Sequence, residues 1–155
     1  MSPHAKRWIT GIVAVPLLIV LILWGSSLLF SSVIALVVVW GVYEYNAMVF
    51  KTKHSLEKAE GLVIGIFIPL AAYFGGVPLM SAAVTFSFII LFLLFLFRMK
   101  DETPDFVALA KVLFGCMYIP FLMSYIIPLR DSENGISWIF FVIIAAFLGD
   151  ISAFY

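Results

Sequence analysis

The chain has 155 residues, of which 65% are hydrophobic and 12% are charged, and its formal net charge at pH 7 is zero. A soluble domain of this length could not bury so many apolar side chains, because its surface is large relative to its volume. The composition therefore excludes a soluble globular domain and predicts a protein embedded in a lipid bilayer. The zero net charge provides no basic surface for nucleic acid, and we expect no nucleic-acid partner.

Long apolar segments alternate along the chain with short polar ones. A membrane-spanning helix needs about 20 apolar residues, because each residue adds about 1.5 Å to its length. The sequence therefore predicts an all-α fold, a polytopic transmembrane helix bundle of about six spans that forms a single membrane domain over residues 1–155. The expected spans are about 8–24, 28–50, 61–74, 77–97, 106–128 and 136–155.

Caps and turns mark the limits of these spans. The third span is short, and we expect it to extend back through Leu56 to an N-cap at Ser55. Before the fifth span, Thr103 is expected to act as the cap and Pro104 to occupy the first helical position, followed by the acidic Asp105. The sequence predicts turns at Gly25-Ser26-Ser27, Gly75-Gly76-Val77-Pro78 and Asn134-Gly135.

Two features inside the spans concern packing. Gly61 and Gly65 form a GxxxG motif, which is typical of close helix packing within a bundle; a contact between two copies in a homodimer is the alternative. Pro69 and Pro120 fall inside spans and predict kinks.

The basic residues predict the orientation of the chain. The first span follows Lys6-Arg7 and has the shape of a signal peptide, but further spans follow at once, so we expect it to be retained. Cations concentrated on one side of a membrane mark the cytoplasmic side, so we expect a multi-pass protein with a cytoplasmic N-terminus. The cations on that side are Lys6, Arg7, Lys51, Lys53, Lys58, Arg98 and Lys100, against Arg130 alone on the other.

Three ionisable residues fall within predicted spans: Glu44, Lys111 and Asp150. Counted from the predicted cytoplasmic ends of their helices, all three lie about 9–12 Å deep. A charge at that depth is costly unless it is paired, hydrated or bound to a cation. Glu44 and Lys111 have structural interpretations as a buried ion pair or, for Lys111, as a side chain that reaches the interface. The short side chain of Asp150, followed by small residues such as Ser152, favours a functional role.

Three segments in register resemble one family. They are residues 6–17 (KRWITGIVAVPL), residues 43–45 (YEY) and residues 128–155, which begin with PLR and end with GDISAFY. They are similar to patterns in bacterial phosphatidate cytidylyltransferases, the CDP-diacylglycerol synthases. Ile151 and Ser152 depart from the family's usual residues, and the family's distal signature does not occur in these 155 residues. The resemblance therefore implies the N-terminal part of a longer enzyme.

The resemblance implies transfer of CMP from CTP to phosphatidate, with release of pyrophosphate, at a bacterial inner membrane. It implies Mg²⁺ as the cofactor, because crowded phosphate charge needs a divalent cation. Asp150 is then expected to be catalytic and to bind or orient the metal. Lys111 and Ser152 are expected to contact substrate, and Glu44 either to contact substrate or to order neighbouring helices.

Two other functions fit the same residues. A membrane kinase similar to polyprenol or dolichol kinases would also use CTP but would transfer a phosphoryl group. A transporter fragment or a non-enzymatic helical subunit would use the buried charges to line a pathway or to lock helices together.

Overall fold

The computed structural model describes residues 15–50, 54–98 and 105–154, and all regular elements in these ranges are helical. By length and composition, four helices could cross a membrane: α2 (Ser27–Val49), α3 (Ser55–Arg98), the stretch Phe106–Arg130 and α7 (Gly135–Phe154). A shorter apolar helix, Val15–Trp24, precedes them and is described only from Val15. The predicted all-α membrane fold is confirmed, and the expected backward extension of the third span to Ser55 is also confirmed.

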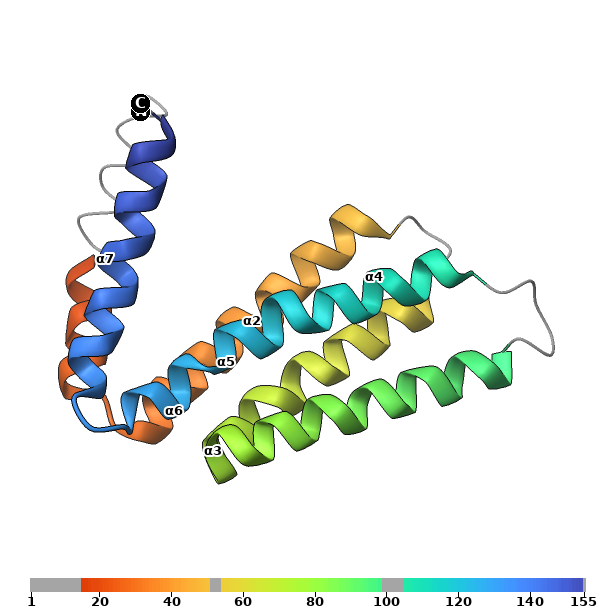
Figure 1. Cartoon of the computed structure of the whole chain (residues 1–155), viewed down its shortest axis with the longest axis horizontal. Coiled ribbons are helices and arrows are strands. Elements are labelled where there is room, and N and C mark those ends of the chain that lie inside the picture. Colours follow the sequence, from red (N-terminus) through yellow and green to blue (C-terminus); the bar gives the residue numbers. More distant parts are fainter. Residues whose placement is uncertain (1–14, 51–53, 99–104, 155) are drawn as a thin grey trace.

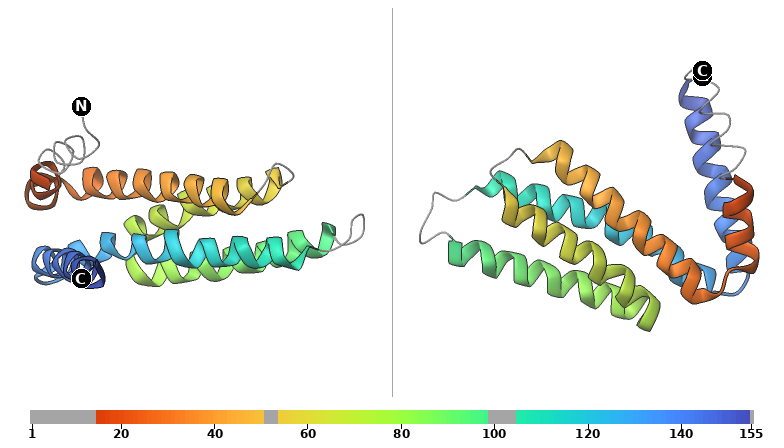
Figure 2. Two further views of the ribbon diagram at one scale, coloured as in Figure 1. Left: turned by 90° about the horizontal axis from the view of Figure 1, so that it is seen from above. Right: turned by 180° about the vertical axis from the view of Figure 1, so that it is seen from behind.

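Helix α3 is a hairpin of two helices. Gly75 and Gly76 have non-helical backbone angles, and Gly76 combines a φ of 60° with a ψ of −151°. Glycine adopts that conformation readily because it has no Cβ. We call residues 55–74 the first arm and residues 77–98 the second arm; they run antiparallel in both views of the ribbon (Figures 1 and 2). The turn predicted at these glycines is confirmed, and it divides α3 into the expected third and fourth spans.

The fifth span is a chain of four short elements: α4 (Phe106–Cys116), the π-helix η1 (Met117–Phe121), α5 (Leu122–Ser124) and α6 (Ile126–Arg130). Pro120 lies inside η1. Because proline has no backbone N–H, it cannot continue an α-helical hydrogen-bond ladder, and a wider turn accommodates it. The predicted irregularity at Pro120 is therefore present as a π-helical turn.

Side-chain caps mark the starts of α2 and α4, and the cap of α4 differs from the prediction. Ser26 caps α2, since its Oγ accepts a hydrogen bond from the backbone N–H of Leu29 at 3.2 Å. The prediction of Thr103 as the cap of the fifth span is wrong: Asp105 is the N-cap, and its Oδ1 accepts from the N–H of Ala108 at 2.9 Å. An aspartate suits this position because its negative charge also faces the positive end of the helix dipole.

Helix α2, the two arms of α3 and the α4–α6 stretch form one bundle, and helix Val15–Trp24 and α7 turn away from its long axis at one end (Figures 1 and 2). Ile22, Phe30 and Ile139 form a small apolar cluster where these two helices leave the bundle. The main core lies between α2, α3, α4 and α6, and it includes the single cysteine. Its most buried members include Ile68, Met80, Leu91, Cys116 and Ile127.

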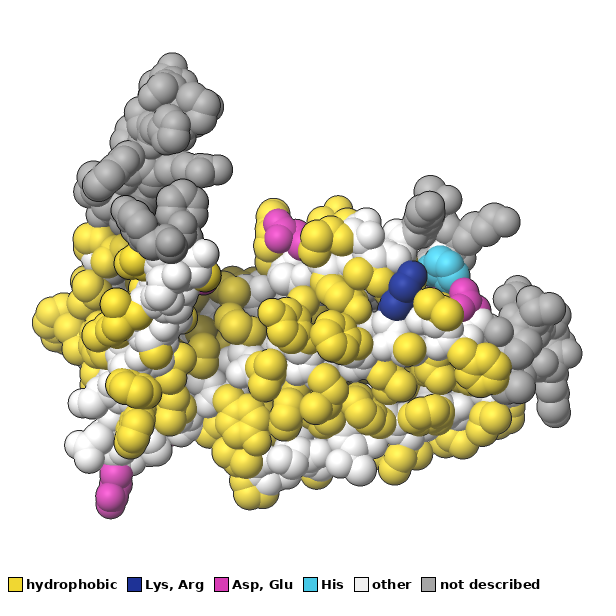
Figure 3. All heavy atoms as spheres, turned by 45° about the horizontal axis from the view of Figure 1, so that its top comes forward, with side chains coloured by type: hydrophobic (Ala, Val, Ile, Leu, Met, Phe, Trp, Pro, Cys, Tyr) yellow, Lys and Arg dark blue, Asp and Glu magenta, His cyan; other side chains and the backbone are white. Residues whose placement is uncertain are grey.

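The outer surface of the bundle is apolar. Figure 3 shows hydrophobic side chains over most of the described face; basic, acidic and histidine side chains meet at one end, and further acidic side chains lie apart from it. Large side chains such as Leu36, Val63 and Phe86 are more than half exposed. Such a surface is stable only against lipid tails, which explains why the buried core is small.

Candidate functional site

Charged side chains gather where four helix ends meet. The end of α2, the start of the first arm, the end of the second arm and the start of α4 lie at the same end of the bundle (Figure 1). We call this the charged end. Glu44 and Lys111 each lie five residues from a helix terminus there, at Val49 and Phe106, or about 8 Å along the axis.

Lys111 joins α4 to the end of α2. Its Nζ donates a hydrogen bond to the carbonyl oxygen of Val49 at 3.3 Å and lies 5.8 Å from the centre of the Phe50 ring. From α2, the hydroxyl of Tyr45 donates to the backbone carbonyl of Lys111 at 2.9 Å. A cation at the C-terminal end of α2 is favourable because the helix dipole is negative there. An ammonium group has three donors, so among the residues that the structure describes the contact with Val49 leaves two of them for other oxygen atoms.

Glu44 does not pair with Lys111, so the buried ion pair considered from the sequence is wrong for the described part of the chain. Glu44 is exposed, and its Oε1 accepts a hydrogen bond from Nε1 of Trp40, one turn earlier in α2, at 2.8 Å. The two residues lie at similar depth, but Glu44 faces outward while Lys111 is half-buried. Shared depth does not place two side chains on facing sides of their helices.

The GxxxG motif is used inside the bundle. A Cβ built on Gly61 would meet the side chain of Asn46 at 3.4 Å, and one on Gly65 would meet Val42 at 3.2 Å. Buried Asn46 also donates to the carbonyl of Lys58 at 3.0 Å. The two glycines therefore allow α2 to approach the first arm closely, as the packing interpretation predicted, and the homodimer alternative loses this support.

An ion cluster that the sequence analysis missed closes the α3 hairpin at the charged end. Arg98, the last residue of the second arm, donates from Nη1 to Glu57 at 3.0 Å and from Nη2 to Glu60 at 2.7 Å. The side chains of Arg98, Glu57 and Glu60 are only 30%, 18% and 16% exposed. The spacing of the two glutamates, three residues apart on one helix face, was a signal available in the sequence.

Arg130 organises the opposite end of the bundle. It donates from Nη2 to the carbonyl oxygens of Ile22 and Gly25, and its guanidinium carbon lies 4.7 Å from the centre of the Phe30 ring. Next to it, Asp131 accepts a hydrogen bond from Oγ of Ser27 at 3.1 Å. Arg130 therefore satisfies terminal carbonyls of helix Val15–Trp24 and ties that helix to α6. The sequence analysis used Arg130 only for orientation and resemblance.

Asp150 lies apart from the charged end, in the distal part of α7, which turns away from the bundle (Figure 1). Its side chain is exposed, and the nearby Ser152 donates from Oγ to the carbonyl of Gly149 at 2.9 Å. The structure therefore does not bring Asp150 together with Glu44 and Lys111. Counting residues gives a position along one helix, whereas the tilt of α7 is decided by its packing near Ile139.

No group of three or more His, Cys, Asp or Glu residues converges within the described ranges. Magnesium does not require such a group, since it keeps several waters and is commonly held by one or two carboxylates together with substrate phosphates. An exposed carboxylate such as Asp150 fits that pattern.

The comparisons with known proteins agree with these features. A model described as the cytidylyltransferase family matches residues 5–155. No curated protein and no solved structure matches the chain. The family match covers nearly the whole chain, including the helix ends that carry Glu44, Lys111 and Asp150. The chain is therefore a membrane-embedded member of the cytidylyltransferase family.

Proposed function

We propose that this chain belongs to a phosphatidate cytidylyltransferase, which transfers CMP from CTP to phosphatidate and forms CDP-diacylglycerol and pyrophosphate. The observation that carries the proposal is the combination of a cytidylyltransferase family match with helices long enough to cross a membrane. CTP is water-soluble and anionic, so an enzyme embedded in lipid is best suited to an acceptor that is itself held in the bilayer. Phosphatidate has both features, since its acyl chains anchor it in the membrane and its phosphate oxygen is the nucleophile.

The reaction exchanges one phosphoanhydride bond for another. A phosphate oxygen of phosphatidate attacks the α-phosphorus of CTP, and the bond from that phosphorus to the bridging oxygen of the β-phosphate breaks. Pyrophosphate leaves with the bonding electron pair, and nothing is oxidised or reduced. The main task of the protein is to position two anionic groups and to offset their charge.

Asp150 and Ser152 are the residues that we assign to the triphosphate. When bound, Mg²⁺ would neutralise phosphate charge at the reacting centre. Asp150 would hold it through its exposed carboxylate, and the Ser152 hydroxyl would donate to a phosphate oxygen. Lys111 would use the donors not taken by Val49 to attract a phosphate oxygen, while Glu44 orders the end of α2 through Trp40.

Labelled CTP tests the proposal with the full-length protein in vesicles that contain phosphatidate. We expect label from the α-phosphate of CTP to enter the lipid, and label from the γ-phosphate to leave as pyrophosphate. Asp150→Asn should lower the rate on the order of 100-fold, while Asp131→Asn, which keeps an oxygen acceptor for Ser27, serves as the matched control. Lipid labelled from the γ-phosphate would indicate a kinase instead. Full activity of a folded Asp150→Asn variant would refute the assigned role.

A further inference from the structure

A long groove runs between the two arms of α3, and the residues that line it all belong to these two arms. It encloses about 710 Å³ and is lined by apolar side chains from both arms, among them Val63, Phe67, Phe86 and Leu94. Charged side chains line one end, where Glu60 and Arg98 form part of the wall, and Ser87 adds a hydroxyl near the other end. The groove is therefore amphipathic along its length, with an apolar channel that ends at the ion cluster.

The length of the groove matches one leaflet of a bilayer. From Phe86 to Arg98 the second arm rises twelve residues, or about 18 Å, and half of a bilayer's hydrocarbon core is about 15 Å. A second groove of about 610 Å³ continues past Phe67 and Phe86 toward the Gly75–Gly76 turn. Phe67 and Phe86 line both grooves, so they mark the boundary between them about halfway along the hairpin, which we call the waist.

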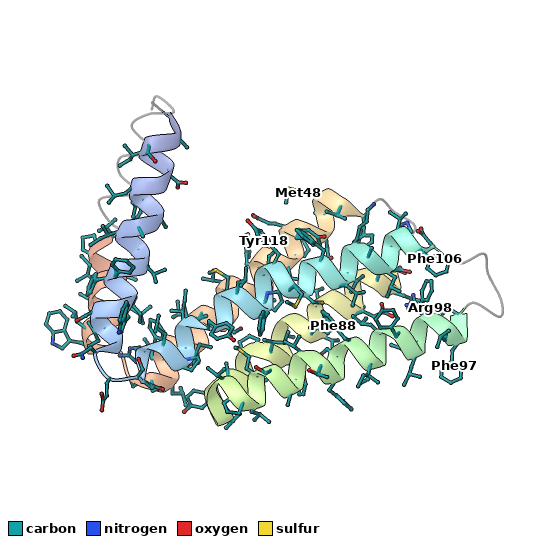
Figure 4. The ribbon with its side chains drawn as sticks, viewed as in Figure 1. Met48, Phe88, Phe97, Arg98, Phe106 and Tyr118 are labelled. Carbon is teal, nitrogen blue, oxygen red and sulfur yellow. The ribbon has the colours of Figure 1, made fainter. Side chains whose placement is uncertain are left out.

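Phe97 and Arg98 both line the groove at the charged end. In Figure 4, Arg98 lies on the inner side of the hairpin. Phe97 is exposed, as are Val63 and Leu94 in the groove wall. In a membrane these surfaces contact acyl chains, so the acyl chain of a surrounding lipid can fill the groove.

The charge of the ion cluster selects the headgroup. Arg98 uses both terminal nitrogens on Glu57 and Glu60, and its Nε points to the carbonyl of Leu94 at 3.5 Å. Two carboxylates and one guanidinium give these three side chains a net charge of −1, and Nδ1 of His54 lies 3.7 Å from Oε2 of Glu57. An anionic headgroup would be repelled there, whereas an ammonium group would find carboxylate oxygens as acceptors.

We propose that this groove is a lateral binding site for a phospholipid with a primary ammonium headgroup, of the phosphatidylethanolamine type. One acyl chain fills the groove as far as the waist formed by Phe67 and Phe86, and the ammonium group binds the carboxylates of Glu60 and Glu57. The site is separate from Asp150 and Lys111, and the repulsion of anionic headgroups distinguishes its lipid from phosphatidate.

Native mass spectrometry of the purified protein, with lipids added at equal concentrations, tests this site. The probes are dioleoyl phosphatidylethanolamine, dioleoyl phosphatidylglycerol and dioleoyl phosphatidate. We expect the wild-type protein to bind the ethanolamine lipid about tenfold more tightly than either anionic lipid, as charge-assisted hydrogen bonds would give. Equal or tighter binding of phosphatidylglycerol or phosphatidate would overturn the proposal.

Two variants separate the headgroup from the groove. Glu60→Gln should reduce the preference for the ethanolamine lipid to about twofold, because one carboxylate acceptor is lost, while Glu133→Gln, at an exposed turn residue, should leave it unchanged. Ala59→Phe, at an exposed position in the groove wall, should reduce binding of the ethanolamine lipid by about tenfold. Ala47→Phe, on the outer face of α2, is its control. If either test variant binds lipid as its control does, the groove is not the site.

Discussion

Gly115 in α4 offers the sharpest test of how α4 packs against α2. A Cβ built on Gly115 would lie 2.5 Å from Cε1 and 3.0 Å from Cδ1 of Tyr45, whose hydroxyl donates to the carbonyl of Lys111. Gly115→Ala should therefore destabilise the protein, although alanine is intrinsically better than glycine in a helix by about 1 kcal/mol. The test is therefore whether Gly115→Ala lowers or raises the free energy of unfolding.

The magnitude follows from three contributions. Overpacking costs about 1–3 kcal/mol, and displacement of Tyr45 weakens a hydrogen bond that contributes about 1 kcal/mol. After subtraction of the helix preference of about 1 kcal/mol, the expected loss in free energy of unfolding is about 1–3 kcal/mol. With Tyr45→Ala already present the clash is gone, so adding Gly115→Ala should stabilise the protein by about 0.5–1 kcal/mol.

The assay is the free energy of unfolding of the purified chain in mixed detergent micelles, titrated with dodecyl sulfate and followed by far-ultraviolet circular dichroism. Gly149→Ala is the control, because a Cβ at Gly149 meets no described atom within 4 Å; it should stabilise α7 by about 0.5–1 kcal/mol. If Gly115→Ala stabilises the protein as Gly149→Ala does, or if Tyr45→Ala fails to reverse its effect, the packing described for α4 and α2 is incorrect.

Two further predictions use the same titration. Arg130→Met should lower the free energy of unfolding by about 2 kcal/mol, because the carbonyls of Ile22 and Gly25 lose a charged donor and the Phe30 ring loses its cation. Arg130→Lys should lose about half as much because it keeps a cation, and equal losses for both variants would show that a positive charge alone contributes nothing at this position. Gly76→Ala should cost about 1–3 kcal/mol, because φ of 60° with an extended ψ is a glycine conformation; an unchanged midpoint would show that the hairpin does not need this backbone.

Much of the fold was predictable because lipid leaves few alternatives. Every backbone N–H and C=O inside a bilayer must be satisfied within the chain, so a long apolar segment in such a protein is a helix. Local chemistry then marks the helix ends. Gly75-Gly76 breaks α3 where its backbone leaves helical geometry, and Ser26 caps α2 as a short hydroxyl side chain can. The cap at Asp105 was placed wrongly because Thr103 and Asp105 both have capping oxygens, and the choice depends on where the helix begins.

The candidate site was less predictable, because its contacts join residues that are far apart in sequence. Arg98 binds Glu60 across 38 residues, and Lys111 reaches Val49 across 62. The hydropathy pattern indicates how far along a helix an ionisable side chain lies. It does not indicate which side of the helix faces a partner. Glu44 and Lys111 show this directly, since they lie at similar depth but make separate contacts.

The sequence by itself determined that the chain is a helical membrane protein, where its helices turn and to which family its motifs are similar, because apolar length and local backbone chemistry are properties of neighbouring residues. Tertiary structure alone decided that Arg98 closes the α3 hairpin, that Lys111 binds the end of α2 and that α7 carries Asp150 away from the charged end. Those outcomes depend on how helices pack and tilt, and packing energies are shared among residues that the sequence does not place together.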